Sequence, residues 1–98
     1  MLMKNFAVYD MKAKTYFMPF YMETEAQARR VLLTSALDVN SALNKFPEDF
    51  ALHQLGTMDY ETGKYTEDIQ EVARVNELLQ SYQLFHPSKD GDDYEEDI

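Results

Sequence analysis

Hydrophobic and polar positions alternate with a period of two in several parts of the first 60 residues. Residues 4–10 and 15–22 form two such runs around residues 11–14, which predicts a β-hairpin. In the second run, positions 16, 18, 20 and 22 share one face, and both faces are apolar or aromatic. Such a strand is either covered on both sides or presents one face to a partner. Pro19 cannot donate a ladder hydrogen bond, which indicates an edge strand or a bulge there.

Residues 46–65 predict a turn, a strand and a second hairpin in succession. Pro47 favours an extended backbone at the residue before it, and residues 50–55 then alternate as a strand does. Gly63 supplies the positive φ that a short hairpin loop requires. We therefore expect Tyr60 and Tyr65 to face each other across this turn.

Two other segments have the period of an amphipathic helix. Thr24 and Gln27 form a capping-box pattern at the start of a predicted helix over residues 24–37. A second helix is predicted over residues 67–83, with acidic residues in its first turn complementing the helix dipole. Residues 41–44 can add a short helical turn within the loop between the helix and the strand.

The order ββαββα predicts an α+β domain with a small, mainly antiparallel sheet and two helices on one face. Pro87 marks the end of the predicted order, which gives one domain over residues 1–87. Residues 88–98 are a block of charge that cannot bury itself, so we expect a disordered acidic tail.

Composition argues against an enzyme. The 98 residues include no cysteine, two histidines and no glycine-rich phosphate loop. His53 lies within the predicted strand and is expected to be a side chain on the sheet surface. The acidic tail lacks the loop spacing of a calcium-binding EF-hand. We therefore expect no catalytic residues, no metal and no cofactor.

Two further absences bear on localisation. The sequence has no apolar run near 18 residues and no signal-type apolar segment after its start, so neither a membrane span nor a secretory signal is expected. The lack of cysteine suits a reducing cytoplasm.

The net charge of −9 is distributed unevenly along the chain. Residues 1–45 carry six basic and four acidic side chains, whereas residues 46–98 carry three basic and fourteen acidic ones. An acidic protein is a poor candidate for binding phosphates, but this segregation leaves a mildly basic, aromatic first half. Single strands are bound by cations along the backbone and by aromatic rings that stack on bases. The candidates of these two kinds are Lys4, Tyr9, Lys12, Lys14, Tyr16, Phe17, Tyr21, Arg29, Arg30 and Lys45.

A set of spaced motifs lies between residue 4 and about residue 66. These motifs are Val8-Tyr9-Asp10, Lys12-Ala13, Tyr16, Pro19-Phe20, Thr24-x-x-Gln27-Ala28, Asn44-Lys45-Phe46-Pro47-Glu48-Asp49-Phe50, Leu55-Gly56 and Asp59-x-x-Thr62-Gly63. In this combination the chain resembles the small non-structural protein of gokushovirus-type microviruses, which are single-stranded DNA phages. The resemblance implies a DNA-binding protein in the cytoplasm of a bacterial host, acting in genome replication or packaging.

The sequence supports two hypotheses about function. The first is a non-enzymatic protein that binds single-stranded DNA, with the acidic tail modulating that binding. The second is an acidic interaction module that binds a basic phage or host protein, such as a replication protein, without touching DNA. Under the second hypothesis the aromatic residues are core or a dimer interface and the cations aid solubility. Both hypotheses allow a homodimer or higher homo-oligomer through the exposed hairpin edge.

Overall fold

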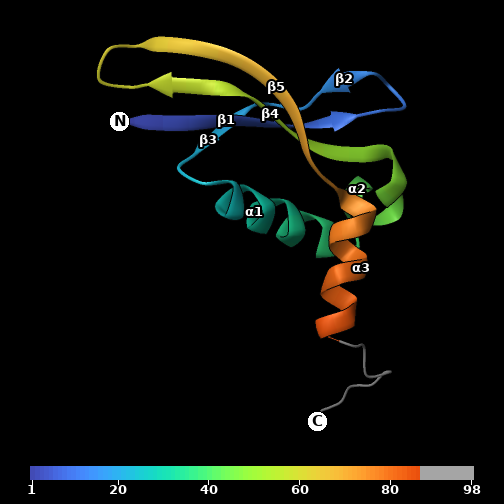
Figure 1. Ribbon diagram of the computed structural model, residues 1–98. Coiled ribbons are helices and arrows are strands. Elements are labelled where there is room, and N and C mark those ends of the chain that lie inside the picture. The colour runs from blue at the N-terminus through green and yellow to red at the C-terminus, as the bar shows by residue number, and fades with distance from the viewer. Residues whose placement is uncertain (87–98) are drawn as a thin grey trace.

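A computed structural model describes residues 1–86 (Figure 1), so the acidic tail and its predicted disorder lie outside the described residues. The predicted α+β class is confirmed. The elements are β1 (Leu2–Asp10), β2 (Thr15–Tyr16), β3 (Phe20–Met22), α1 (Glu25–Leu37), α2 (Ala42–Lys45), the 3-10 turn η1 (Pro47–Asp49), β4 (Phe50–Asp59), β5 (Lys64–Arg74) and α3 (Val75–Phe85).

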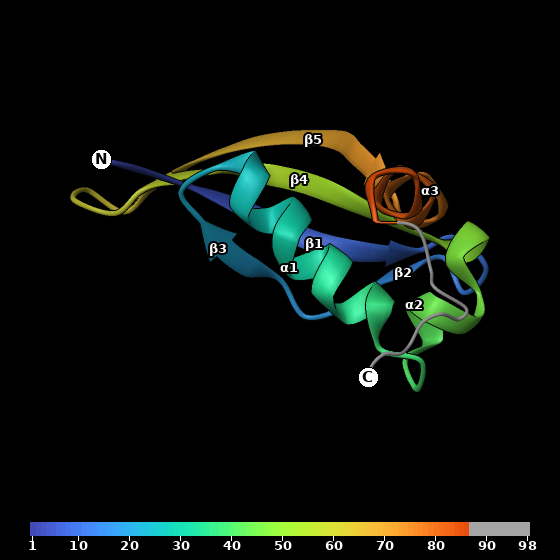
Figure 2. The ribbon, with the colours of Figure 1, turned by 90° about the horizontal axis from the view of Figure 1, so that it is seen from below.

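The sheet is antiparallel throughout and is built around β1. One edge of β1 pairs with β4, which in turn pairs with β5. The other edge of β1 pairs with β3 near its start and with β2 near its end. All three helices lie on one side of this sheet (Figures 1 and 2). We call that side the helix face and the opposite side the outer face.

The core lies between the sheet and the helices. Phe6 and Leu52, on neighbouring strands, are fully buried, as is Val75 at the start of α3. The period of two in β1 and β4 and the stripe on α1 direct these apolar side chains to one layer. The core cluster comprises Phe6, Val8, Ala28, Leu32, Ala36, Leu43, Phe50, Leu52 and Val75.

Helix α1 begins as the sequence predicted. The Thr24 hydroxyl accepts a hydrogen bond from the Gln27 backbone N–H at 3.2 Å, and the Gln27 side chain accepts one from the Thr24 backbone N–H at 3.1 Å. This capping box satisfies two backbone donors that the first turn of a helix leaves unpaired. The predicted short turn is also present as α2, which Ser41 caps.

The single strand predicted over residues 15–22 is wrong at its centre. Residues 17–19 separate β2 from β3, because Pro19 interrupts the ladder. This break changes which side chains share a face. Tyr16 pairs with Tyr9 on the outer face, whereas Phe20 and Met22 pack against the core on the helix face.

The second hairpin forms, but its register differs from the prediction. Asp59 pairs with Lys64, and Tyr65 pairs with Met58, so Tyr60 and Tyr65 do not face each other. The loop therefore contains residues 60–63. Gly63 has a φ of 80°, in the left-handed region that glycine adopts without strain.

The helix predicted over residues 67–83 is also wrong in its first half. Residues up to Arg74 belong to β5, and α3 begins only at Val75. The pairing of β5 with the long strand β4 overrides the local helical period. The acidic residues expected to support a helix dipole lie instead on an exposed edge strand, where charge opposes pairing with other chains.

The β4–β5 pairing depends on close contact at Gly56. A Cβ atom on this glycine would overlap the Thr66 carbonyl oxygen and lie 2.6 Å from the Tyr65 hydroxyl oxygen. The missing side chain is what allows the Tyr65 ring to cross β4 there.

We expect Gly56→Ala to lower the free energy of unfolding by about 1–3 kcal/mol, because the backbone of β5 must shift to accommodate the methyl group. Urea unfolding measures this loss. Gly63→Asn is the matched control, since nothing lies within 4 Å of its Cβ position and asparagine tolerates a positive φ. Equal losses in both variants would contradict the steric explanation.

Candidate nucleic-acid interface

The outer face of the sheet carries a row of aromatic side chains that the helices do not cover. In β1, the positions that alternate with buried Phe6 and Val8 point away from the helices. The same alternation places His53, next to buried Leu52, on this face of β4. The outer face is therefore determined by the same period of two that forms the core.

Three rings on the outer face form what we call the tyrosine–histidine cluster: Tyr9, Tyr16 and His53. The ring centroids of Tyr9 and His53 are 5.0 Å apart in a stacked arrangement, and those of Tyr9 and Tyr16 are 4.7 Å apart. The Tyr16 hydroxyl and His53 Nδ1 are 2.8 Å apart and share a hydrogen bond. The cluster thus joins three strands into one partly exposed aromatic surface.

The electrostatics of this cluster favour an uncharged surface. Burial lowers the pKa of His53 from its ordinary value of 6.5, and the nearby Glu71 carboxylate only partly opposes that shift. Burial also raises the pKa of Tyr16, with a smaller contribution from Tyr9. At neutral pH the imidazole is therefore neutral, and its Nδ1 can accept a hydrogen bond from the Tyr16 hydroxyl.

A second group on the outer face, the asparagine–tyrosine cluster, comprises Asn5, Tyr21 and Tyr65. Asn5 is the Cα partner of Tyr21 on β3 and of Gly56 on β4. The Asn5 Nδ2 atom donates a hydrogen bond to the Tyr65 hydroxyl at 3.1 Å. Tyr21 and Tyr65 remain 42% and 41% exposed. Asn5 thus lies between two exposed rings.

Two lysines lie at the end of the sheet that carries the tyrosine–histidine cluster. They belong to the loop between β1 and β2, which starts directly after Tyr9-Asp10. The Asp10 carboxylate accepts hydrogen bonds from the backbone N–H groups of Lys12 and Ala13, at 3.0 and 3.1 Å. Lys14 closes the loop with a φ of 59°. The loop therefore holds both lysine backbones in a fixed turn beside the aromatic rings.

The structure does not bring all ten candidate residues together. Tyr9, Tyr16 and Tyr21 share the outer face, and Lys12 and Lys14 adjoin it. Lys4 alternates with Asn5 and is on the helix-face side of β1. Arg30 and Lys45 are exposed on α1 and α2.

Arg29 is partly exposed, but its guanidinium group makes contacts that stabilise the fold. Its guanidinium group forms an ion pair with Glu25 at 2.9 Å and donates a hydrogen bond to the Val72 carbonyl, also at 2.9 Å. The second bond ties α1 to β5. Of the ten candidates, Arg29 is thus a poor choice for a phosphate contact.

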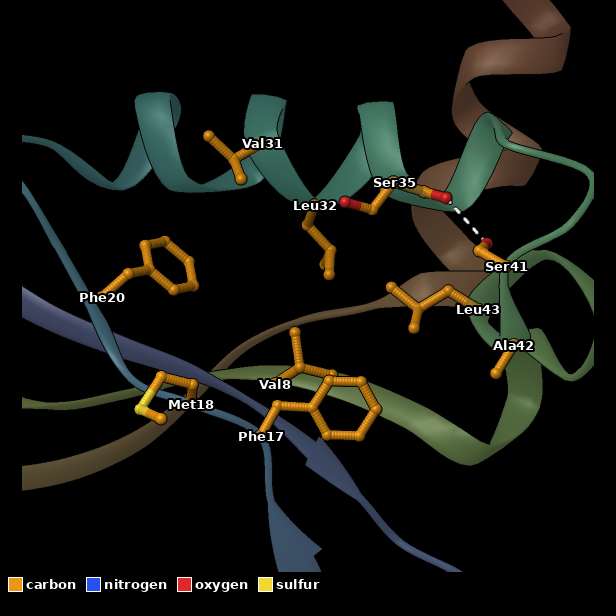
Figure 3. A pocket seen from close by; sticks show the side chains of 10 residues that line it. All are labelled: Val8, Phe17, Met18, Phe20, Val31, Leu32, Ser35, Ser41, Ala42 and Leu43. Carbon is orange, nitrogen blue, oxygen red and sulfur yellow. Dashed lines mark hydrogen bonds between the residues drawn. The ribbon is translucent and has the colours of Figure 1, made fainter.

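Phe17 lies on the helix face, where it lines an apolar groove of about 470 Å³ (Figure 3). The residues between β2 and β3 form one wall of this groove, and α1 and α2 form the other. The Ser41 hydroxyl donates a hydrogen bond to the Ser35 carbonyl across its upper edge. The lining residues are Val8, Phe17, Met18, Phe20, Val31, Leu32, Ser35, Ser41, Ala42 and Leu43.

Sequence reasoning missed Asn5 and Tyr65 as members of the outer face and did not assign His53 to a cluster. Asn5 and His53 are each next to a core residue in their strands, so the period of two carried a signal for both. For Tyr65 the signal was hidden, because the predicted register paired it with Tyr60. The cross-strand neighbours that make these residues a surface follow only from the observed register.

The fold and the outer face define a small α+β protein with an open, aromatic sheet face. The chain belongs to the family described as Phage ORF5 protein, which matches residues 3–78 and so extends from β1 into α3. It is therefore a bacteriophage protein. No curated protein and no solved structure matches the chain. Within residues 1–86, none of the helices is long and apolar enough to cross a membrane.

The lowered pKa of His53 predicts a pH dependence of stability. In the unfolded chain the imidazole has its ordinary pKa of 6.5, so the unfolded state binds more protons once the pH falls to that region. The free energy of unfolding should therefore decrease as the pH is lowered from about 7.5 to about 5, and by less in His53→Gln. Urea unfolding at both pH values measures the difference. An NMR titration midpoint for His53 at or above 6.5 would contradict the assignment.

Proposed function

We propose that this phage protein binds single-stranded DNA on the outer face of its sheet, without catalysing a reaction. The observation that carries the proposal is the tyrosine–histidine cluster, an exposed aromatic surface directly beside the loop that contains Lys12 and Lys14. Base stacking on such rings contributes about 1–3 kcal/mol per base, and nearby cations contact the phosphates.

Single strands fit this surface better than duplexes do. The bases of a duplex are stacked on one another and their faces are not accessible to protein rings, whereas those of a single strand are. Only two of the candidate lysines adjoin the outer face, so we expect few phosphate contacts. For two phosphates of a single strand, log K falls against log salt with a slope of about −1.4.

Membership in a phage family indicates where the proposed binding would take place. We propose that the protein acts on the single-stranded genome of a microvirus, during replication or packaging, in the cytoplasm of the host bacterium. The family match supports the phage origin, and the resemblance of residues 4–66 to the small non-structural protein of gokushovirus-type microviruses supports the finer assignment.

Replacing one stacking ring should weaken binding without affecting the fold. We expect Tyr16→Leu to reduce the affinity for a fluorescent single-stranded oligonucleotide by about 5- to 150-fold, the range that corresponds to one stacked base. Tyr60→Leu is the matched control, because Tyr60 is also exposed but lies in the hairpin loop, away from the outer face. Equal affinities of the two variants would contradict binding at the cluster, as would tighter binding of duplex than of single strand.

Removing residues 88–98 should strengthen the same binding. This segment contains six acidic side chains and one lysine, so it repels phosphates or competes with them for Lys12 and Lys14. We expect the truncated chain to bind the oligonucleotide more tightly at low salt, with the difference shrinking as salt is added. An unchanged affinity would show that the acidic residues do not modulate DNA binding, and a weaker affinity would show that they support it; either result would contradict the prediction.

A second candidate function is an acidic interaction module that binds a basic phage or host protein. The observation that favours it is the end of α3, where Leu84 and Phe85 are 80% and 79% exposed directly before the acidic segment. Pull-down of a basic partner that depends on residues 84–98 but not on Tyr16 would support this function over DNA binding.

A further inference from the structure

We propose that the asparagine–tyrosine cluster is a second base-binding position, in which the Asn5 amide hydrogen-bonds the edge of a nucleobase and Tyr21 and Tyr65 contact its faces. This inference rests on the proposed function and deepens it. It assigns Asn5 as a residue that hydrogen-bonds the edge of a base, in addition to the rings that stack on base faces. The ligand class is a nucleobase of a single strand with hydrogen-bonding groups on its edge: an N–H donor pairs with a free Oδ1, and an acceptor pairs with a free Nδ2 if the amide is exchanged end for end.

Only one of the two polar atoms of the Asn5 side-chain amide has a hydrogen-bond partner within the described residues. Asn5 is 9% exposed, and its Oδ1 atom accepts no hydrogen bond from any residue in the described range 1–86. Its Nδ2 atom donates to the Tyr65 hydroxyl. Exchanging the oxygen and nitrogen of the amide only exchanges which end is satisfied, because a tyrosine hydroxyl can donate or accept. One polar group of Asn5 thus lacks a partner in either orientation.

Such a group is unusual, because buried polar atoms nearly always have a hydrogen-bond partner. An apolar side chain at this position of β1 would avoid the loss of stability that an unpaired buried carbonyl causes. A ligand that donates a hydrogen bond to Oδ1 removes this loss of stability. Binding of a hydrogen-bond donor at this position is therefore favourable.

The surroundings of the amide match the shape of a base. Tyr21 and Gly56 are the lateral neighbours of Asn5 on the two adjoining strands, and Tyr65 crosses over Gly56 to reach it. Because Gly56 has no side chain, the Tyr65 ring, which is partly exposed, can lie against the backbone there and reach Asn5. Rotation of Tyr65 uncovers the amide between two aromatic rings, where a flat heterocycle can stack.

The two clusters can be occupied by one strand. Asn5 and Tyr9 are four residues apart on β1, which corresponds to about 13 Å. This distance exceeds the separation of two stacked bases, so bases in the two clusters are splayed apart with the backbone passing between them.

A single tryptophan can report on the second position, because the chain contains none. In Tyr21→Trp, a base that stacks in the asparagine–tyrosine cluster should quench the fluorescence of the introduced indole. The probes are a short oligothymidylate and an abasic strand with the same sugar-phosphate backbone. We expect quenching by the first and none by the second. Tyr60→Trp, in the hairpin loop, should respond to neither.

The role of the amide is tested by Asn5→Ala and Asn5→Thr. We expect each to bind oligothymidylate about fivefold more weakly, the loss that corresponds to one neutral hydrogen bond, without a lower melting temperature. Asn40→Ala, in the exposed loop before α2, is the matched control and should change neither quantity.

The outcomes separate the two proposals. Wild-type binding with no quenching in Tyr21→Trp and no effect of Asn5 variants would overturn the second position and leave DNA binding at the tyrosine–histidine cluster intact. A large fall in melting temperature in both Asn5 variants would show that the amide supports the fold and would likewise overturn the inference. Absence of oligonucleotide binding at low salt by both the wild-type chain and the chain without residues 88–98 would overturn both proposals.

Discussion

The central position of β1 is the constraint on which the rest of the structure depends. Its backbone is hydrogen-bonded on both edges, to β4 on one and to β2 and β3 on the other. The period of two then places Phe6 and Val8 under the helices and Asn5 and Tyr9 on the outer face. A shift of β1 by one residue would exchange these two sets. The hydrogen bonds that specify the core therefore also specify the candidate binding surface.

The strands beside β1 adapt to it through irregularities. The register shifts between Asn5 and Phe6 in the β1–β4 pair, and at two further points in the β4–β5 pair. Bulges of this kind increase twist and redirect side chains. Here they leave Gly56 beside Asn5 and bring Ala73 back to the core opposite Leu52. The bond from Arg29 to the Val72 carbonyl then ties α1 to β5 where that register has just changed.

Local signals predicted the parts of the structure that local interactions determine. The capping box at Thr24, the strand after Pro47 and the positive φ at Gly63 were all readable from the sequence. Residues 67–74 were not, because pairing with β4 outweighs their helical period. The candidate site divides in the same way. Residue type identified Tyr9, Tyr16 and Tyr21. Phe17 has the same character but directly follows Tyr16 and lies on the other face, whereas the break at residues 17–19 is what places Tyr21 on the same face as Tyr16.

An acidic chain can still offer a site for nucleic acid, because the charges within a few ångströms of the site affect phosphate binding more than the net charge of the whole chain does. The Debye length is about 8 Å at physiological salt. The acidic hairpin end at Asp59 is paired with Leu2, eight residues from Asp10 along β1 and thus about 26 Å from the lysine loop. Glu71, the nearest acid to His53 in the ladder, is paired with Arg74 at 3.0 Å. The tyrosine–histidine cluster lies beside Lys12 and Lys14, but also beside the Asp10 carboxylate, which accepts a hydrogen bond from the Lys12 backbone N–H at 3.0 Å. In the function proposed above, which offers only two cations for phosphate contacts, stacking on several rings would outweigh those contacts in the free energy of binding and so favour a single strand over a duplex.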